Sequence, residues 1–183
     1  MGGAALQRCG SVLERSASAA EGFMAAPYRG NTGHGVYFIT ACTFQKKNLL
    51  QSDRMAGLLV EVLLHYRAER KYLLHEFVVM PDHFHLLLTP VVTLERALQF
   101  IKGGFSYRAK KEGIFAGEIW EKSFYDRRVR NLAEYAAFRV YIQQNPVKRG
   151  LVRIPKEYRY SSARSGVALD EVPQRLKPVT LSA

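Results

Sequence analysis

The 183-residue chain is poor in cysteine and in acidic residues, and it has no long apolar run. Its two cysteines, Cys9 and Cys42, have no second thiol at CxxC spacing, which argues against a disulfide framework, a zinc ribbon or a redox pair and favours a reducing cytoplasm. No stretch approaches the roughly 18 consecutive apolar residues of a membrane-spanning helix. The 16 acidic residues are outnumbered by 27 lysines and arginines, giving a net charge of +11. The expected partner is therefore a polyanion in solution, with no membrane contact.

Length and composition predict one globular domain with tails. The chain is within the roughly 100–200 residues of a single domain, and 48% of its residues are hydrophobic. Residues 1–30 are rich in alanine, glycine and serine and lack the apolar run of a signal peptide, so we interpret them as a disordered tail. Met24 leaves open that translation begins there. The domain is expected over 31–165 and a C-terminal tail over 166–183.

Hydrophobic periodicity predicts the element order β-α-β-β-α-β-α. Strands are expected over 35–44, 72–80, 83–89 and 124–129, with Pro81 and Asp82 as the turn between the second and the third. Helices are expected over 53–70, with Ser52 as the N-cap, and over 93–111, which Thr93 can cap. Asn131 opens a third helix, which Pro146 is expected to end. This order is typical of the split βαβ, or ferredoxin-like, α+β fold, in which helices cover one face of an antiparallel sheet; here a further C-terminal helix follows.

Two histidines in the third predicted strand form the most informative local pattern. His83 and His85 are two residues apart, so both imidazoles stand on one face of the strand while Phe84 enters the opposite layer. Neighbouring imidazoles on one face could hold a shared metal ion. This pattern alone leaves open the alternative that the two are half-buried histidines that bind no ligand.

A tyrosine and an asparagine share one face of the last predicted helix. Tyr141 and Asn145 are four residues apart. A phenol, with an ordinary pKa of about 10, becomes a useful nucleophile on phosphate when a metal polarises the ester. Two histidines and one asparagine oxygen could supply three protein ligands of an open metal site. Taken alone, Tyr141 is more often a helix-core aromatic, and Asn145 before Pro146 is more often a helix terminator.

Basic residues gather in the second half of the chain, between Ile101 and Arg164, where aromatic residues are interleaved with them. Cations neutralise a nucleic-acid backbone and aromatic rings stack on unpaired bases, so single-stranded nucleic acid fits this mixture best. The candidates for DNA contact, chosen by charge and position, are Lys102, Arg108, Arg127, Arg128, Arg130, Lys148 and Arg149.

Three ordered motifs support a family resemblance. They are VVMPDHFHLLL at 78–88, IWEKSFYD at 119–126 followed by Arg130, and YIQQNPVKRGLV at 141–152. With these motifs the chain resembles the REP-associated tyrosine transposases, bacterial relatives of the single-tyrosine HUH transposases. The resemblance runs from about Tyr28 to about Ser165.

The resemblance implies a ferredoxin-like HUH fold that cleaves and rejoins single-stranded DNA at a hairpin of a repeated extragenic palindrome. It implies that His83, His85 and Asn145 bind Mg²⁺ or Mn²⁺, and that Tyr141 forms a 5′-phosphotyrosine intermediate. The expected location is cytoplasmic and associated with the nucleoid.

Two questions stay open at this point. The alternative function is a non-catalytic hairpin DNA-binding protein that retains the fold, and the choice between monomer and homodimer is undecided. An RNA-binding ferredoxin-like module is disfavoured, because Phe84 lies opposite the histidine face.

Overall fold

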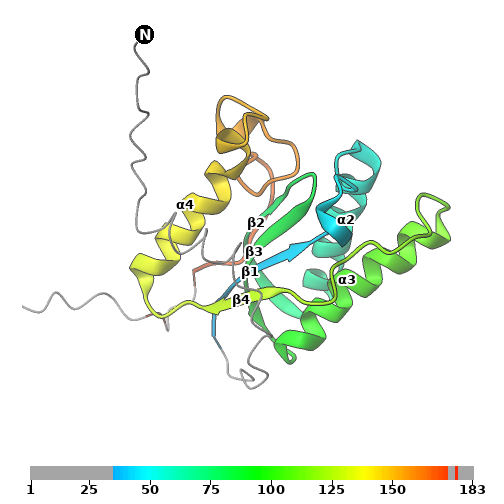
Figure 1. Ribbon diagram of the computed structural model, residues 1–183. Coiled ribbons are helices and arrows are strands. Elements are labelled where there is room, and N and C mark those ends of the chain that lie inside the picture. The colour runs from blue at the N-terminus through cyan, green and yellow to red at the C-terminus, as the bar shows by residue number, and fades with distance from the viewer. Residues whose placement is uncertain (1–34, 173–175, 177–183) are drawn as a thin grey trace, which may run out of the picture.

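The computed structural model describes residues 35–172 and 176, which form four strands and three α-helices (Figure 1). The elements are β1 (Tyr37–Cys42), α2 (Asp53–Ala68), β2 (Tyr72–Val79), β3 (His83–Pro90), α3 (Leu94–Lys111), β4 (Tyr125–Arg128) and α4 (Leu132–Lys148), with short 3-10 turns η1 (Phe44–Lys46) and η2 (Pro155–Glu157). Each predicted strand and helix is present. The expected N-terminal tail, including Met24, lies outside the described residues.

The strands form one antiparallel sheet in the order β2-β3-β1-β4. β3 pairs with both β1 and β2, so β1 and β2 run parallel to each other on its two sides. β4 pairs with the outer edge of β1. This topology is the predicted ferredoxin-like arrangement, and the α+β prediction is confirmed. Within the described residues, no helix combines the length and the apolarity needed to cross a membrane.

Helices α2 and α3 cover one face of the sheet (Figure 1). Both begin at predicted caps: the Ser52 hydroxyl accepts from the Met55 amide, and the Thr93 hydroxyl accepts from the Arg96 amide, each at 3.3 Å. Phe84 is fully buried in this layer. The strand alternation predicted around the two histidines therefore holds.

Helix α4 covers the opposite face (Figure 1). Its N-cap is Asn131, whose side-chain oxygen accepts from the Glu134 amide at 2.9 Å. Phe138 and Ile142 are buried against the sheet, and the Phe138 ring stacks on Phe38 of β1 with centroids 4.4 Å apart. This packing sets the distance between α4 and the central strands.

The expectation that Pro146 ends α4 is wrong, because the helix continues to Lys148. Proline removes only its own N–H from the ladder, and the Arg149 amide still donates to the Asn145 carbonyl at 3.0 Å. The helix is terminated by Gly150, which lies two residues after Lys148 and has φ of +68°. The Gly150 amide bonds the Val147 carbonyl and the Leu151 amide bonds the Pro146 carbonyl, both at 2.9 Å, which is a Schellman motif.

The segment after α4 covers the outer edge of β2. The Tyr160 carbonyl accepts from the Val79 amide at 2.9 Å, and the Ser162 amide donates to the Phe77 carbonyl at 3.0 Å. Farther along, the Asp170 carboxylate accepts from Arg67 at 2.7 and 3.0 Å and from the Leu74 amide at 2.7 Å. The chain thus packs against α2 and β2 as far as Asp170, and the outer edge of β2 is protected.

Candidate active site

The two histidines of β3 meet in the centre of the sheet. His83 pairs with Cys42 of β1 and His85 with Thr40, and the Nε2 atoms of the two histidines are 3.1 Å apart. His83 is 7% exposed and His85 4%. Two imidazole nitrogens therefore point at one place in a nearly closed part of the molecule.

Each histidine ring is held by its other nitrogen. His83 Nδ1 is 2.6 Å from Oδ1 of Asp82, and His85 Nδ1 is 2.8 Å from Oγ1 of Thr40. Bonds of this kind orient the ring and leave Nε2 for a ligand, as at most histidine metal sites. The local fold thus presents both Nε2 atoms, not Nδ1, to the shared space.

The charges around the pair favour an ionised Asp82 and a neutral His85. The hydrogen bond from His83 is the main cause that lowers the pKa of Asp82, and the Arg149 guanidinium, 3.5 Å from its second oxygen, lowers it further. Burial holds the pKa of His85 well below its ordinary value, and the electrostatic interactions with His83 and Arg149 act in the same direction. A neutral imidazole is the form that binds a metal.

Helix α4 brings Tyr141 to the histidines. The Tyr141 ring centroid is 5.2 Å from that of His85 and 5.8 Å from that of Phe38. Lys148, two turns later on the helix, places its Nζ 5.7 Å from the centre of the Tyr141 ring. The two patterns predicted from β3 and from the last helix therefore come together in space.

A cavity of about 130 Å³ opens beside the histidines and the tyrosine. Its walls are formed by Phe38, Thr40, Cys42, Lys46, Asp82, His83, His85, Glu121, Ser123, Phe124, Tyr125, Tyr141 and Arg149. Aromatic rings form much of this wall, and Lys46 and Arg149 add two positively charged side chains to it. A concave site with convergent polar groups and shifted pKa values is typical of an active site.

Asn145 lies one turn beyond Tyr141, is 7% exposed, and is absent from the cavity wall. In the described part of the chain, no third histidine, cysteine, aspartate or glutamate joins the pair in a metal-binding group. A third protein ligand would have to be of another kind, such as an amide oxygen.

A family model described as "Transposase IS200 like" matches residues 33–145, which is more than half of the chain and includes His83, His85 and Tyr141. The chain belongs to this transposase family.

Similar proteins agree with the predicted resemblance to REP-associated tyrosine transposases, which is confirmed. A Haemophilus influenzae protein named "Putative REP-associated tyrosine transposase" is 26% identical over 165 residues, covering 80% of this chain and 89% of that protein. The REP-associated tyrosine transposase of Escherichia coli K12 is 26% identical over 140 residues, covering 73% and 79%. A solved structure of a REP-associated tyrosine transposase bound to a REP hairpin has the same fold, with a TM-score of 0.64 and 22% identity over 86% of this chain and 100% of that one.

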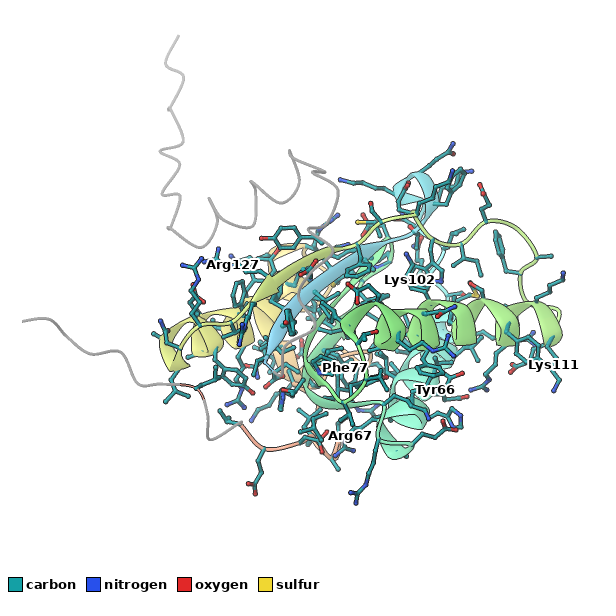
Figure 2. The ribbon with its side chains drawn as sticks, turned by 90° about the horizontal axis from the view of Figure 1, so that it is seen from below. Tyr66, Arg67, Phe77, Lys102, Lys111 and Arg127 are labelled. Carbon is teal, nitrogen blue, oxygen red and sulfur yellow. The ribbon has the colours of Figure 1, made fainter. Side chains whose placement is uncertain are left out.

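Five of the seven basic residues predicted to contact DNA lie near the cavity, in β4 or directly after it. Arg149 is on the cavity wall, and Lys148 lies over the Tyr141 ring. Arg127, labelled in Figure 2, forms an ion pair at 2.8 Å with Glu134 in the first turn of α4. Arg128 and Arg130 are exposed.

Lys102 and Arg108 of α3 are engaged within the protein. The Lys102 side chain is labelled in Figure 2. Its Nζ donates to the Glu121 carbonyl at 2.7 Å, and burial lowers its pKa. It supports the segment that forms one cavity wall. Arg108 pairs with Glu61 at 2.8 Å and with Glu112 at 3.2 Å on the opposite side of the sheet. The structure does not bring these two residues to the cavity.

Sequence reasoning missed the groups that orient the histidines. Asp82 was interpreted only as part of a turn, although a carboxylate directly before a histidine pair is a usable signal for an orienting group. Thr40 gives no such signal, because its role depends on the β1–β3 register. Glu121 was also missed; its Oε1 accepts from the Gln45 amide at 2.7 Å, in a loop where Gln45 and Lys46 have φ of 54° and 51°.

Proposed function

We propose that this transposase-family protein is a metal-dependent endonuclease and strand transferase, which acts on single-stranded hairpin DNA through a 5′-phosphotyrosine. One observation supports it most: the Nε2 atoms of His83 and His85 converge at 3.1 Å, and the Tyr141 ring stands beside them across the cavity. A metal pair and a phenol in one concave site are the parts that such a cleavage needs.

The residues fit a divalent metal. His83 and His85 would hold it through Nε2, since their Nδ1 atoms are engaged and His85 is kept neutral. Asn145 is the proposed third ligand, through its side-chain oxygen. Mg²⁺ or Mn²⁺ is the proposed ion, and Zn²⁺ is the competitor that imidazole ligands favour. When bound, the ion supplies Lewis-acid polarisation of the scissile phosphate.

Side chains at the cavity would have different roles in the remaining steps of the reaction. Tyr141 Oη gives up its proton and attacks phosphorus; a tyrosine–phosphorus bond forms, the bond to the 3′ oxygen breaks, and that oxygen takes up a proton as it leaves. The Lys148 ammonium lies where it stabilises negative charge on the phenolate, and Arg149 offers a cation to the phosphate oxygens. The covalent link conserves the phosphodiester energy, so a 3′-hydroxyl can reverse the step.

The proposed partner is hairpin DNA. The solved structure with the same fold is described as bound to a REP hairpin, and the present chain has a net charge of +11. We assign phosphate contacts to Lys148 and Arg149 beside the cavity, to Arg127 and Arg128 of β4, and to Arg130 just after this strand. Lys102 and Arg108 receive no such role, because their charges are satisfied elsewhere. A DNA substrate places the protein at the nucleoid, in the cytoplasm.

The test is incubation of purified protein with labelled single-stranded hairpins from its own genome's repeats, with Mg²⁺, Mn²⁺ or EDTA, followed by a denaturing gel. We expect a metal-dependent covalent adduct that Tyr141→Phe abolishes while hairpin binding on a native gel is kept. Tyr107→Phe is the control, because Tyr107 is 65% exposed on the opposite helix layer. An adduct from Tyr141→Phe removes Tyr141 from this role. Retarded DNA with no adduct under any metal supports the binding-only alternative.

A further inference from the structure

The rotation of α4 about its axis decides where Tyr141 lies. Side chains extend 5–6 Å from a helix axis, so a rotation of about 20° displaces their ends by about 2 Å. The face of α4 that packs on the sheet is narrow, and its aromatic and aliphatic contacts come from Tyr135, Phe138 and Ile142. Apolar packing is non-directional, so it holds the helix against the sheet more strongly than it fixes this rotation.

Polar contacts hold α4 on both of its flanks. On the β4 flank, Glu134 accepts from Arg127 at 2.8 Å. On the β2 flank the signs are reversed, and Arg139 Nε donates to Glu76 Oε1 at 2.6 Å. Rotation in either direction would lengthen one of these pairs. Tyr141 projects on the flank opposite to Arg139, toward Phe38 and the histidines.

Glu76 is the more deeply fixed of these anchors. It is only 2% exposed, and its carboxylate also accepts from Gln143 Nε2 at 3.2 Å and from Ser162 Oγ at 2.5 Å. Gln143 is one turn after Arg139, so two consecutive turns of the helix bond the same carboxylate. The pair between the buried Glu76 and the half-exposed Arg139 adds little net stability. Such a pair can instead specify one arrangement of the helix on the sheet.

The backbone of β2 is adapted to this contact. Leu74 and Phe77 both face the α2–α3 layer, and the β2–β3 register shifts between Leu74 and Glu76. This irregularity leaves both His75 and Glu76 on the α4 side, where the His75 ring is 6.1 Å from that of Tyr135. A bulge that redirects side chains is typical of positions beside functional sites.

We propose that Glu76 is a positioning residue, which sets the rotation of α4 and so holds the Tyr141 ring opposite His85. The effect on cleavage rests on the proposed function, in which Tyr141 is the nucleophile. The effect on the placement of the ring does not depend on that function.

Two measurements on Glu76→Gln separate placement from chemistry. The first is the nuclear Overhauser effect between the ring protons of Tyr141 and those of His85, measured in metal-free protein. The centroids of these two rings are 5.2 Å apart. The second is the single-turnover rate of adduct formation, compared with the Kd for the same hairpin. We expect loss of the Overhauser contact and a rate reduced about a hundredfold at unchanged Kd, because a displacement of about 1 Å can cost that much.

Two further variants control the test. Arg139→Lys keeps the charge but not the planar guanidinium, and its half-exposed position tolerates the change; we expect a smaller loss of rate. Arg159→Gln removes another exposed ion pair, 3.5 Å from Asp53, and should match the wild type. A retained Overhauser contact in Glu76→Gln overturns the proposal. If wild-type protein forms no adduct, the proposed function fails, and the Overhauser contact alone decides the role of Glu76.

Discussion

Replacing Asp82 tests whether the histidine pair is a metal site. Asp82 Oδ1 is 2.6 Å from His83 Nδ1, a short charge-assisted contact that fixes the ring and makes Nε2 a better donor. Its other oxygen is 3.5 Å from the Arg149 guanidinium. Asp82→Asn keeps an oxygen that can accept from Nδ1–H but removes the charge, whereas Asp82→Ala removes both.

The expected losses follow from this difference. Removing an orienting partner of a metal-binding histidine typically weakens metal affinity by about 10–100-fold. We place Asp82→Asn at the lower end, about tenfold or 1.4 kcal/mol, and Asp82→Ala near the upper end, about a hundredfold or 2.7 kcal/mol. In both variants Arg149 loses its carboxylate partner near the metal position and adds to the loss by repulsion.

The assay is calorimetric titration of Mn²⁺ into metal-free protein near neutral pH, with thermal unfolding as a check on folding. Glu61→Gln is the matched control, because it also removes one negative charge but lies on α2, on the other side of the sheet. Wild-type Mn²⁺ affinity in Asp82→Ala would refute the reasoning. So would an equal loss in Glu61→Gln, since the effect would then be one of net charge.

Two further predictions concern stability. An added Cβ at Gly104 would lie 2.5 Å from Cε2 of Tyr66, while a Cβ at Gly103 would have nothing within 4 Å. In urea unfolding, we expect Gly103→Ala to raise the free energy of unfolding by about 0.5–1 kcal/mol. Gly104→Ala should be less stable than Gly103→Ala by about 1 kcal/mol or more. Equal stabilities would contradict this close approach. Burial lowers the pKa of His75, so as pH falls below about 6.5 the unfolded chain takes up a proton at this residue that the folded chain does not; His75 thereby lowers stability by up to about 1.4 kcal/mol per pH unit, in addition to the contribution of His85. His75→Gln should show a shallower slope in this window; a slope parallel to that of the wild type would exclude His75 as a source.

The order of strands and helices could be predicted because each element carries its own signals. Ser52, Thr93 and Asn131 cap the helices that they were expected to cap. The end of α4 was predicted wrongly because two signals compete there: Pro146 lies in the last turn, and the glycine that terminates the helix comes four residues later. Gly150, which can adopt φ of +68°, was the stronger terminator.

The candidate site was predictable in its central residues and not in the residues around them. His83, His85 and Tyr141 could be selected because their spacing is local, within one strand or one helix. Thr40 and Glu76 could not, since one depends on the register between β1 and β3 and the other on a bulge in β2. Contacts between distant segments of the chain decide both roles, and no periodic pattern of one segment contains them.

The alternation of side chains that places β3 in the sheet also places the two histidines in the site, and for this reason their position could be predicted from the sequence. Phe84 and Leu86 fill the α2–α3 layer, while His83 and His85 alternate with them toward α4. A slip of one residue in the pairing would reverse every side chain, burying both imidazoles among the apolar helices and turning two large apolar residues into the cavity. Such a slip would lose apolar burial and desolvate two polar rings at once. The hydrophobic effect that aligns the strand therefore also fixes the face on which the two Nε2 atoms meet.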